Sequence, residues 1–134
     1  MSIWGHRVSV KLVALVAALL VVGGFVTAMS RIPDHEMTLV ARGMAFYLEG
    51  DLETPNPTIR LRAGERVRIV LRNEERGITH DFAVPVWNEG VGLIGWNEQE
   101  SVTFDVPDAP GRYEYVCRPH MLMMRGVILV EDAG

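Results

Sequence analysis

The chain of 134 residues has one cysteine, Cys117, and one lysine, Lys11. A single cysteine excludes a framework of disulfides within the chain. In an exported protein, a lone thiol is reactive unless a metal, a partner cysteine or burial protects it. The role of Cys117 is therefore the first question that the sequence raises.

Basic residues are also scarce. All 17 acidic residues follow Arg31, together with only 10 of the 13 basic ones, so the formal charge of that part is −7. A nucleic-acid-binding surface needs a basic patch, so the composition argues against nucleic acid as a partner. The same charge permits docking to a basic surface on another protein.

Charge is absent from residues 12–30, a run of 19 residues that is mostly Leu, Val and Ala. Arg7 and Lys11 precede it, which favours a cytoplasmic N-terminus and an exported C-terminus. The length approaches the roughly 20 residues that span a bilayer, and a cleaved signal usually has a shorter apolar region. Cleavage after Ala28 is the alternative. We expect residues 1–31 to be a transmembrane anchor or signal. Residues 32–134 would then be one domain outside the cytoplasm, either membrane-anchored or, after cleavage, secreted.

Long runs with a helical period are absent after residue 33, and alternation takes their place. In 66–72, Val67, Ile69 and Leu71 fall on one face and arginines on the other. Such alternation is typical of strands with one buried face. Other predicted strands are 102–106, 112–115 and 127–130, with weaker candidates at 37–48 and 58–61.

Turn residues separate these segments, and this spacing predicts an all-β antiparallel sandwich or barrel. Residues 85–99 are rich in glycine and irregular, and we expect them to form a loop that crosses between sheets. Trp87 and Trp96 in this segment are interpreted as packing residues.

Metal-ligand residue types gather around the cysteine. His120 follows Cys117 by three positions, methionines follow at 121, 123 and 124, and His80 lies upstream. A thiolate, two imidazoles and a weak axial thioether suit both oxidation states of copper. A bound metal would also deprotonate the thiol. A structural zinc site would need four Cys or His ligands. After Arg31 the chain offers one cysteine and three histidines, and we interpret the spare His35 as part of a solvated linker.

These motifs resemble the cupredoxins, the plastocyanin, azurin and amicyanin family of small blue copper proteins. The resemblance covers about residues 37–130. It rests on Gly64 and Asn73 leading to His80, on Pro110-Gly111-Arg112-Tyr113 leading to Cys117, and on His120-x-x-x-Met124-Arg125-Gly126. It implies a Greek-key β-sandwich or barrel that holds one mononuclear type 1 copper. His80, Cys117 and His120 would be equatorial ligands and Met124 the axial ligand, with Met123 as the alternative.

The resemblance also assigns roles around the ligands. Asp81 stands where many members have an asparagine that ties the two ligand loops together. A carboxylate accepts hydrogen bonds but does not donate them; ionised, it would lower the reduction potential, and protonated, it would mimic asparagine. Pro119 would lie next to the ligands, and Pro119, Met121 and Leu122 would dock partner proteins. Core packing is the alternative for Met121, Leu122 and Met123.

The resemblance implies an electron carrier, not an enzyme. It would cycle between Cu(I) and Cu(II) and exchange electrons with a respiratory complex, an oxidase or a soluble cytochrome. Two alternatives remain open: copper storage or delivery, which the methionine cluster favours, and an open-site copper protein similar to nitrosocyanin, which would lack the thioether ligand.

Overall fold

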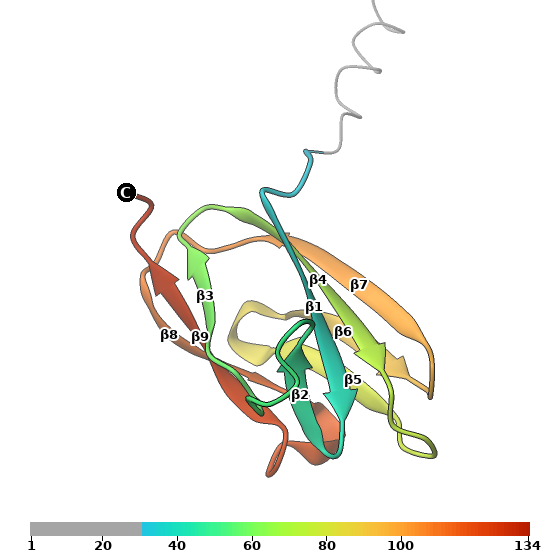
Figure 1. Cartoon of the computed structure of the whole chain (residues 1–134). Coiled ribbons are helices and arrows are strands. Elements are labelled where there is room, and N and C mark those ends of the chain that lie inside the picture. The colour runs from blue at the N-terminus through green and yellow to red at the C-terminus, as the bar shows by residue number, and fades with distance from the viewer. Residues whose placement is uncertain (1–30) are drawn as a thin grey trace, which may run out of the picture. The chain divides into compact units, whose positions relative to one another are not determined.

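Nine strands and two short 3₁₀ helices make up the regular structure of residues 31–134, the part of the chain that the computed structural model describes (Figure 1). The strands are β1 (His35–Arg42), β2 (Ala45–Leu48), β3 (Ile59–Arg62), β4 (Arg66–Asn73), β5 (His80–Val84), β6 (Glu89–Ile94), β7 (Gln99–Asp105), β8 (Gly111–Val116) and β9 (Arg125–Glu131). The 3₁₀ helices are η1 (Pro85–Trp87) and η2 (Arg118–His120).

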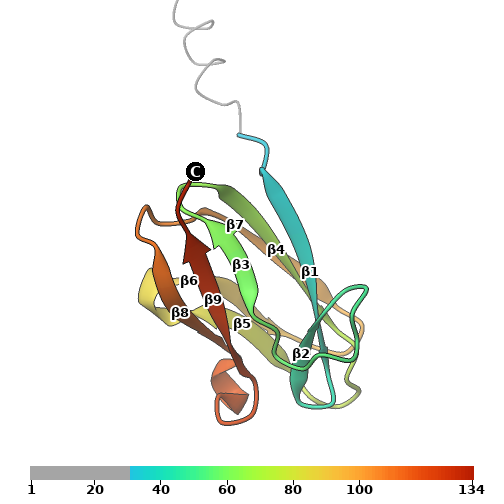
Figure 2. The same cartoon turned by 60° about the vertical axis from the view of Figure 1, so that its left-hand side comes forward.

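The strands form two sheets that lie face to face (Figures 1 and 2). One has the order β2-β1-β4-β7 and the other β3-β9-β8-β5-β6. The alternation read from the sequence is confirmed in β4, where Val67, Ile69 and Leu71 are fully buried in the core between the sheets. The all-β expectation is therefore confirmed for the described residues.

Most of the strand pairings are antiparallel, as expected, but two are parallel. β1 runs parallel to β4, with His35 beside Val67, and β3 runs parallel to β9. The chain reaches β4 from β1 through β2 and through β3, which belongs to the other sheet. Because of this crossover, β4 runs in the same direction as β1. The parallel pairing could not be predicted, since the alternation of side chains is the same in parallel and antiparallel strands.

The predicted loop at 85–99 contains a strand, β6, which corrects that expectation. β6 lies at the edge of its sheet, and most of its side chains are partly or fully exposed, so the sequence shows no alternation. Its Gly90 lies directly against the neighbouring strand, because a Cβ there would collide with the backbone oxygen of Phe82. Glycine thus allows β6 to pair closely with β5 and at the same time weakens the strand signal.

The two tryptophans near this strand differ in their surroundings. Trp87 packs against Tyr113, with ring centroids 4.7 Å apart, and the packing role expected for it is confirmed. Trp96 is 47% exposed and lies beneath the Arg76 guanidinium, 4.0 Å from its carbon to the ring centroid. The packing expectation is therefore wrong for Trp96, which forms a cation–π contact at the surface.

The transmembrane anchor or signal expected within residues 1–31 falls on residues 1–30, which lie outside the described residues. Within the described part, no helix is long and apolar enough to cross a membrane. Residues 32–134 form a unit of their own.

Candidate metal centre

Two neighbouring strands bring His80 and Cys117 together. His80 is the first residue of β5, and Cys117 directly follows β8, which runs antiparallel to β5. Antiparallel pairing places the start of one strand beside the end of the other. The backbone N–H of Asp81 therefore donates to Cys117 Sγ at 3.5 Å, and His80 Nδ1 lies 3.8 Å from the same sulfur.

The loop from Cys117 to Met124 brings the second histidine back to the cysteine. Met124 N–H donates to the His120 carbonyl at 2.9 Å, and Cys117 N–H donates to the Met124 carbonyl at 2.9 Å. Between them, η2 forms a single turn at the end of the domain (Figure 2). Pro119 is exposed in this turn, and its ring restricts the backbone between the two ligands.

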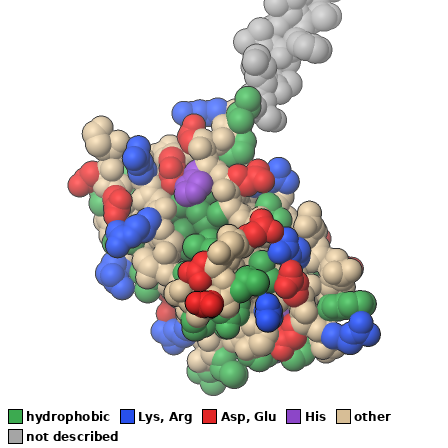
Figure 3. Space-filling view, in the orientation of Figure 1, with side chains coloured by type: hydrophobic (Ala, Val, Ile, Leu, Met, Phe, Trp, Pro, Cys, Tyr) green, Lys and Arg blue, Asp and Glu red, His purple; other side chains and the backbone are tan. Residues whose placement is uncertain are grey.

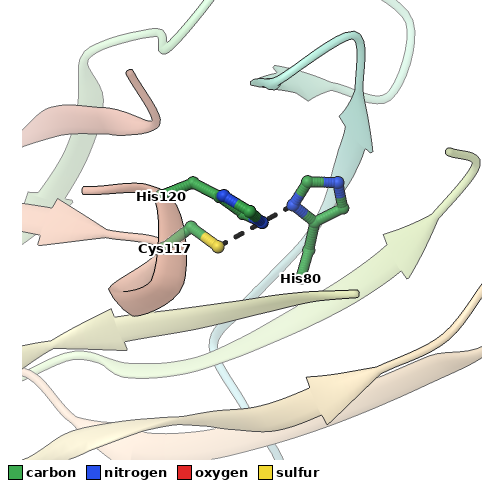
Figure 4. A group of neighbouring side chains, drawn as sticks. All are labelled: His80, Cys117 and His120. Carbon is green, nitrogen blue, oxygen red and sulfur yellow. Dashed lines mark hydrogen bonds between the residues drawn. The ribbon is translucent and has the colours of Figure 1, made fainter. Parts of the chain in front are cut away.

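His80, Cys117 and His120 converge on one point. Each offers a ligand atom, and these atoms all lie within 4.8 Å of one another. Figure 4 shows the three side chains directed toward a common centre. His80 and Cys117 are fully buried, whereas His120 is half-buried at the surface.

Burial keeps Cys117 and His80 uncharged. It raises the pKa of the Cys117 thiol to about 11, with the Asp81 carboxylate adding to the effect and the Asp81 backbone N–H opposing it. Burial also lowers the pKa of His80, although the Glu75 carboxylate opposes this change. At neutral pH the site therefore presents a thiol and a neutral imidazole. A metal ion that binds there must displace the thiol proton.

Hydrogen bonds fix the tautomers of both histidines. His80 Nε2 lies 3.0 Å from Glu75 Oε2, and His120 Nε2 lies 3.2 Å from the carbonyl oxygen of Thr79. Since a carboxylate and a carbonyl accept hydrogen bonds, each ring carries its proton on Nε2 and a lone pair on Nδ1. The lone pair of His80 faces Cys117. Sequence reasoning missed Glu75, because a carboxylate five residues before a ligand has no fixed direction.

Asp81 joins the two ligand segments. Its buried carboxylate accepts from the Arg118 backbone N–H at 2.7 Å and from Arg118 Nε at 2.6 Å. Arg118 follows Cys117, so this ion pair connects β5 to the loop that carries the other two ligands. The Arg118 side chain and backbone thus both donate to the two oxygens of Asp81.

The three methionines of the loop have different exposures. Met124 is fully buried, whereas Met121 is 49% and Met123 is 59% exposed. The Met123 carbonyl accepts from the Asn56 side chain at 3.0 Å, so the loop is attached to the β2–β3 connection. Of these three, only Met124 has its side chain in the interior with the ligands.

An apolar patch surrounds the exposed edge of His120. A cavity of about 530 Å³ is lined by Met44, Arg118, Pro119, His120, Met121, Leu122 and Met123. Leu122 is 90% exposed. In Figure 3, hydrophobic side chains gather at the end of the domain where Figure 1 shows the β8–β9 connection. His35 lies elsewhere, with its Nδ1 3.7 Å from Glu65.

Residues 48–131 match the family described as copper binding proteins, plastocyanin/azurin family. The chain belongs to this family. No curated protein is significantly similar to it in sequence.

Solved structures of the same fold are similar to this cupredoxin. Auracyanin B superposes with a TM-score of 0.61 at 23% identity, covering 77% of this chain and 93% of its own. Rusticyanin from Thiobacillus ferrooxidans superposes with a TM-score of 0.56 at 21% sequence identity. The match covers 84% of this chain and 94% of rusticyanin. The multicopper oxidase McoA from Aquifex aeolicus superposes with a TM-score of 0.55 at 16% sequence identity. The match covers 76% of this chain but 29% of the oxidase. The fold thus also resembles a part of a larger oxidase.

The donor set fits copper. One buried thiol, one buried imidazole and one half-buried imidazole, all within reach of one ion, make up the equatorial donor set of a blue copper centre. His80, Cys117 and His120 therefore form the type 1 copper site of this cupredoxin.

Proposed function

We propose that this cupredoxin is a one-electron carrier. The observation that carries the proposal is the position of His120, which belongs to the buried ligand cluster and also lies in the lining of the exposed apolar cavity. A half-buried imidazole edge gives an electron a short path between the site and a docked protein. The exposed Met121 and Leu122 provide an apolar surface around that edge for a partner.

The residues of the site suit this task because hydrogen bonds within the protein hold them in place. When bound, copper supplies the one-electron couple between Cu(I) and Cu(II). Hydrogen bonds to the imidazoles, to the Cys117 sulfur and to Asp81 hold the donors in one arrangement. A fixed ligand set reorganises little when the charge of the metal changes, and this favours rapid transfer. Met124 completes the proposed set as the axial ligand, supported by its full burial.

The proposed location is outside the cytoplasm, with residues 1–31 as a membrane anchor or signal. Support comes from the uncharged run at 12–30 and the cations Arg7 and Lys11 before it. The proposed partners are redox proteins: a respiratory complex, an oxidase or a soluble cytochrome. A tether would raise the effective concentration of the carrier near a membrane-bound partner.

The test is the visible absorption spectrum of the full chain loaded with Cu(II), beside Cys117→Ser as control. We expect an intense thiolate-to-copper band that gives a blue colour, bleaches reversibly with a reductant and is absent from the control. Absence of the band in the wild type, or loss of copper on reduction, would refute the electron-carrier proposal.

A second candidate function is copper delivery. Three methionines, Met44, Met121 and Met123, line the cavity beside His120, and thioethers favour Cu(I). Delivery requires copper that exchanges readily. A carrier holds its copper through many redox cycles, so rapid removal of Cu(I) by a competing chelator would favour delivery.

A further inference from the structure

The Glu75 carboxylate contacts the copper ligand His80 on the side away from the cysteine. Glu75 Oε2 lies 3.0 Å from His80 Nε2, while His80 Nδ1 faces Cys117 Sγ at 3.8 Å. The His80 side chain is fully buried and that of Glu75 is only 17% exposed. The imidazole ring thus lies between a sulfur ligand and a largely buried carboxylate.

The backbone N–H of Met44 holds this carboxylate, and the Asn73 side chain holds the backbone of Glu75. The same oxygen, Oε2, accepts from the Met44 backbone N–H at 2.9 Å, in the turn between β1 and β2. Glu75 N–H donates to Asn73 Oδ1 at 2.8 Å, and Asn73 Nδ2 donates to the carbonyls of Ile78 at 2.7 Å and Ile94 at 3.1 Å. Asn73 thereby shapes the turn that presents Glu75 to the ring.

The two histidine ligands differ in the charge of the group behind them. His120 Nε2 meets the neutral carbonyl of Thr79, whereas His80 Nε2 meets a carboxylate. A carbonyl would orient the ring equally well. A carboxylate also makes the imidazole a stronger donor to the metal and places a negative charge close to it. The carboxylate therefore does more than position the ring.

We propose that Glu75 is a positioning residue that orients His80 and lowers the reduction potential of the site, an inference that rests on the proposed electron-carrier function. A more basic Nδ1 and a nearby negative charge both stabilise Cu(II) more than Cu(I). The carboxylate keeps the Nε2 proton on its own side of the ring, so His80 meets the metal through Nδ1. Glu75 acts through His80 and does not itself reach the metal.

The first test compares Glu75→Gln with Glu74→Gln in the copper-loaded full chain. Glutamine keeps an acceptor oxygen for His80 and Met44 but removes the charge. Glu74 is the matched control, because it is adjacent, more exposed and paired with Arg72 at 3.1 Å. In a redox titration of the blue band, the equilibrium between Cu(II) and Cu(I) should shift about tenfold toward Cu(I) in Glu75→Gln. This shift is equivalent to a rise of about 59 mV in the one-electron reduction potential. Glu74→Gln should show a much smaller shift. Equal shifts in the two variants, or no shift in Glu75→Gln, would overturn the proposal.

A second measurement does not depend on colour or redox activity. Zn²⁺ affinity of the metal-free chain should fall by about 10- to 100-fold in Glu75→Ala, because the ring loses its orienting partner. Glu75→Gln should retain most of the affinity, and thermal unfolding without metal shows whether each variant is folded. Unchanged affinity in a folded Glu75→Ala would refute the positioning role. This measurement tests Glu75 even if the wild type lacks a blue band, so failure of the electron-carrier proposal remains distinguishable.

Discussion

Asp81 and Arg118 form an ion pair that links two ligand-bearing segments through a backbone and a side-chain hydrogen bond, at 2.7 and 2.6 Å. The carboxylate is 3% exposed and the Arg118 side chain 59% exposed. Solvent screening weakens the side-chain part of this pair. Both bonds end on the same buried carboxylate, but the backbone N–H of Arg118 forms its bond without the entropy cost of ordering a long side chain. The backbone hydrogen bond should therefore account for most of the stabilisation.

Substitutions at Asp81 separate these two contributions. Asp81→Asn keeps an oxygen that accepts from the Arg118 N–H, so the free energy of unfolding should fall by less than about 1 kcal/mol. Asp81→Ala removes the acceptor and should cost about 1–3 kcal/mol. Urea unfolding of the metal-free chain measures both. Equal losses would show that the ion pair, not the backbone bond, connects the segments.

Met124 and Met123 can be distinguished by matched substitutions to leucine. Met124→Leu should alter the blue band and raise the reduction potential, because an axial thioether stabilises Cu(II) and leucine supplies no donor. Met123→Leu should change neither, since its side chain is 59% exposed. Both substitutions nearly conserve volume, so the fold should tolerate them. Absorption spectra and redox titrations provide the comparison. A changed spectrum in Met123→Leu alone would reverse the assignment.

The metal-free chain should lose stability in alkaline solution. The pKa of Cys117 is about 11 in the folded chain against an ordinary value of 9.0, so the unfolded state releases the proton first as pH rises. Below pH 9, the ordinary pKa of a thiol, the buried thiol makes its full contribution to the free energy of unfolding. This contribution is lost as the pH rises toward 11. The loss should be about 2–3 kcal/mol.

Denaturant titrations between pH 8 and about 10 check this effect, with Cys117→Ser as the control. The free energy of unfolding should decline less with rising pH in the serine variant, because that variant has no thiol to ionise. Burial also raises the pKa of Tyr115 above its ordinary value of 10.0. The free energy of unfolding of both chains should therefore decline further above pH 10. Identical slopes for the two chains below that pH would contradict the role of Cys117.

Leu122 provides a test of the apolar patch that needs no knowledge of the partner. Leu122→Glu should slow electron self-exchange severalfold, because two carriers that meet at this surface would bring like charges together. Val86→Glu is the control: Val86 is 69% exposed and follows the opposite end of β5 from His80. NMR line broadening in mixtures of oxidised and reduced protein gives the rates. Equal slowing by both variants would place the exchange surface elsewhere.

Cys117 and His120 could be predicted as ligands from the sequence because their chemistry and spacing are both local. They lie within one loop, and the alternation in β4 identified its buried face directly. The reason for Gly126 could not be read in this way. A Cβ at that position would collide with the ring of Tyr115, whose hydroxyl donates to the Pro57 carbonyl at 2.6 Å. Such contacts depend on the arrangement of three separate segments.

The contacts that sequence reasoning missed share one physical cause. The direction of the Glu75 side chain depends on the hydrogen bonds of Asn73 and on a backbone group of Met44, a distant residue. The parallel pairing of β1 with β4 depends on a crossover between sheets. Each is set by packing across the fold, and neither leaves a periodic trace along the chain.

The interior position of β9 has a consequence for the order of assembly. β9 lies between β3 and β8, and the loop with Cys117, His120 and Met124 connects β8 to β9. As the chain emerges during synthesis, the sheet lacks an inner strand until residues 125–131 are available. Until then the copper loop is attached at one end only. The complete ligand set can therefore bind the metal only after the last strand has joined the sheet. A chain truncated before β9 should fail to bind copper at this site.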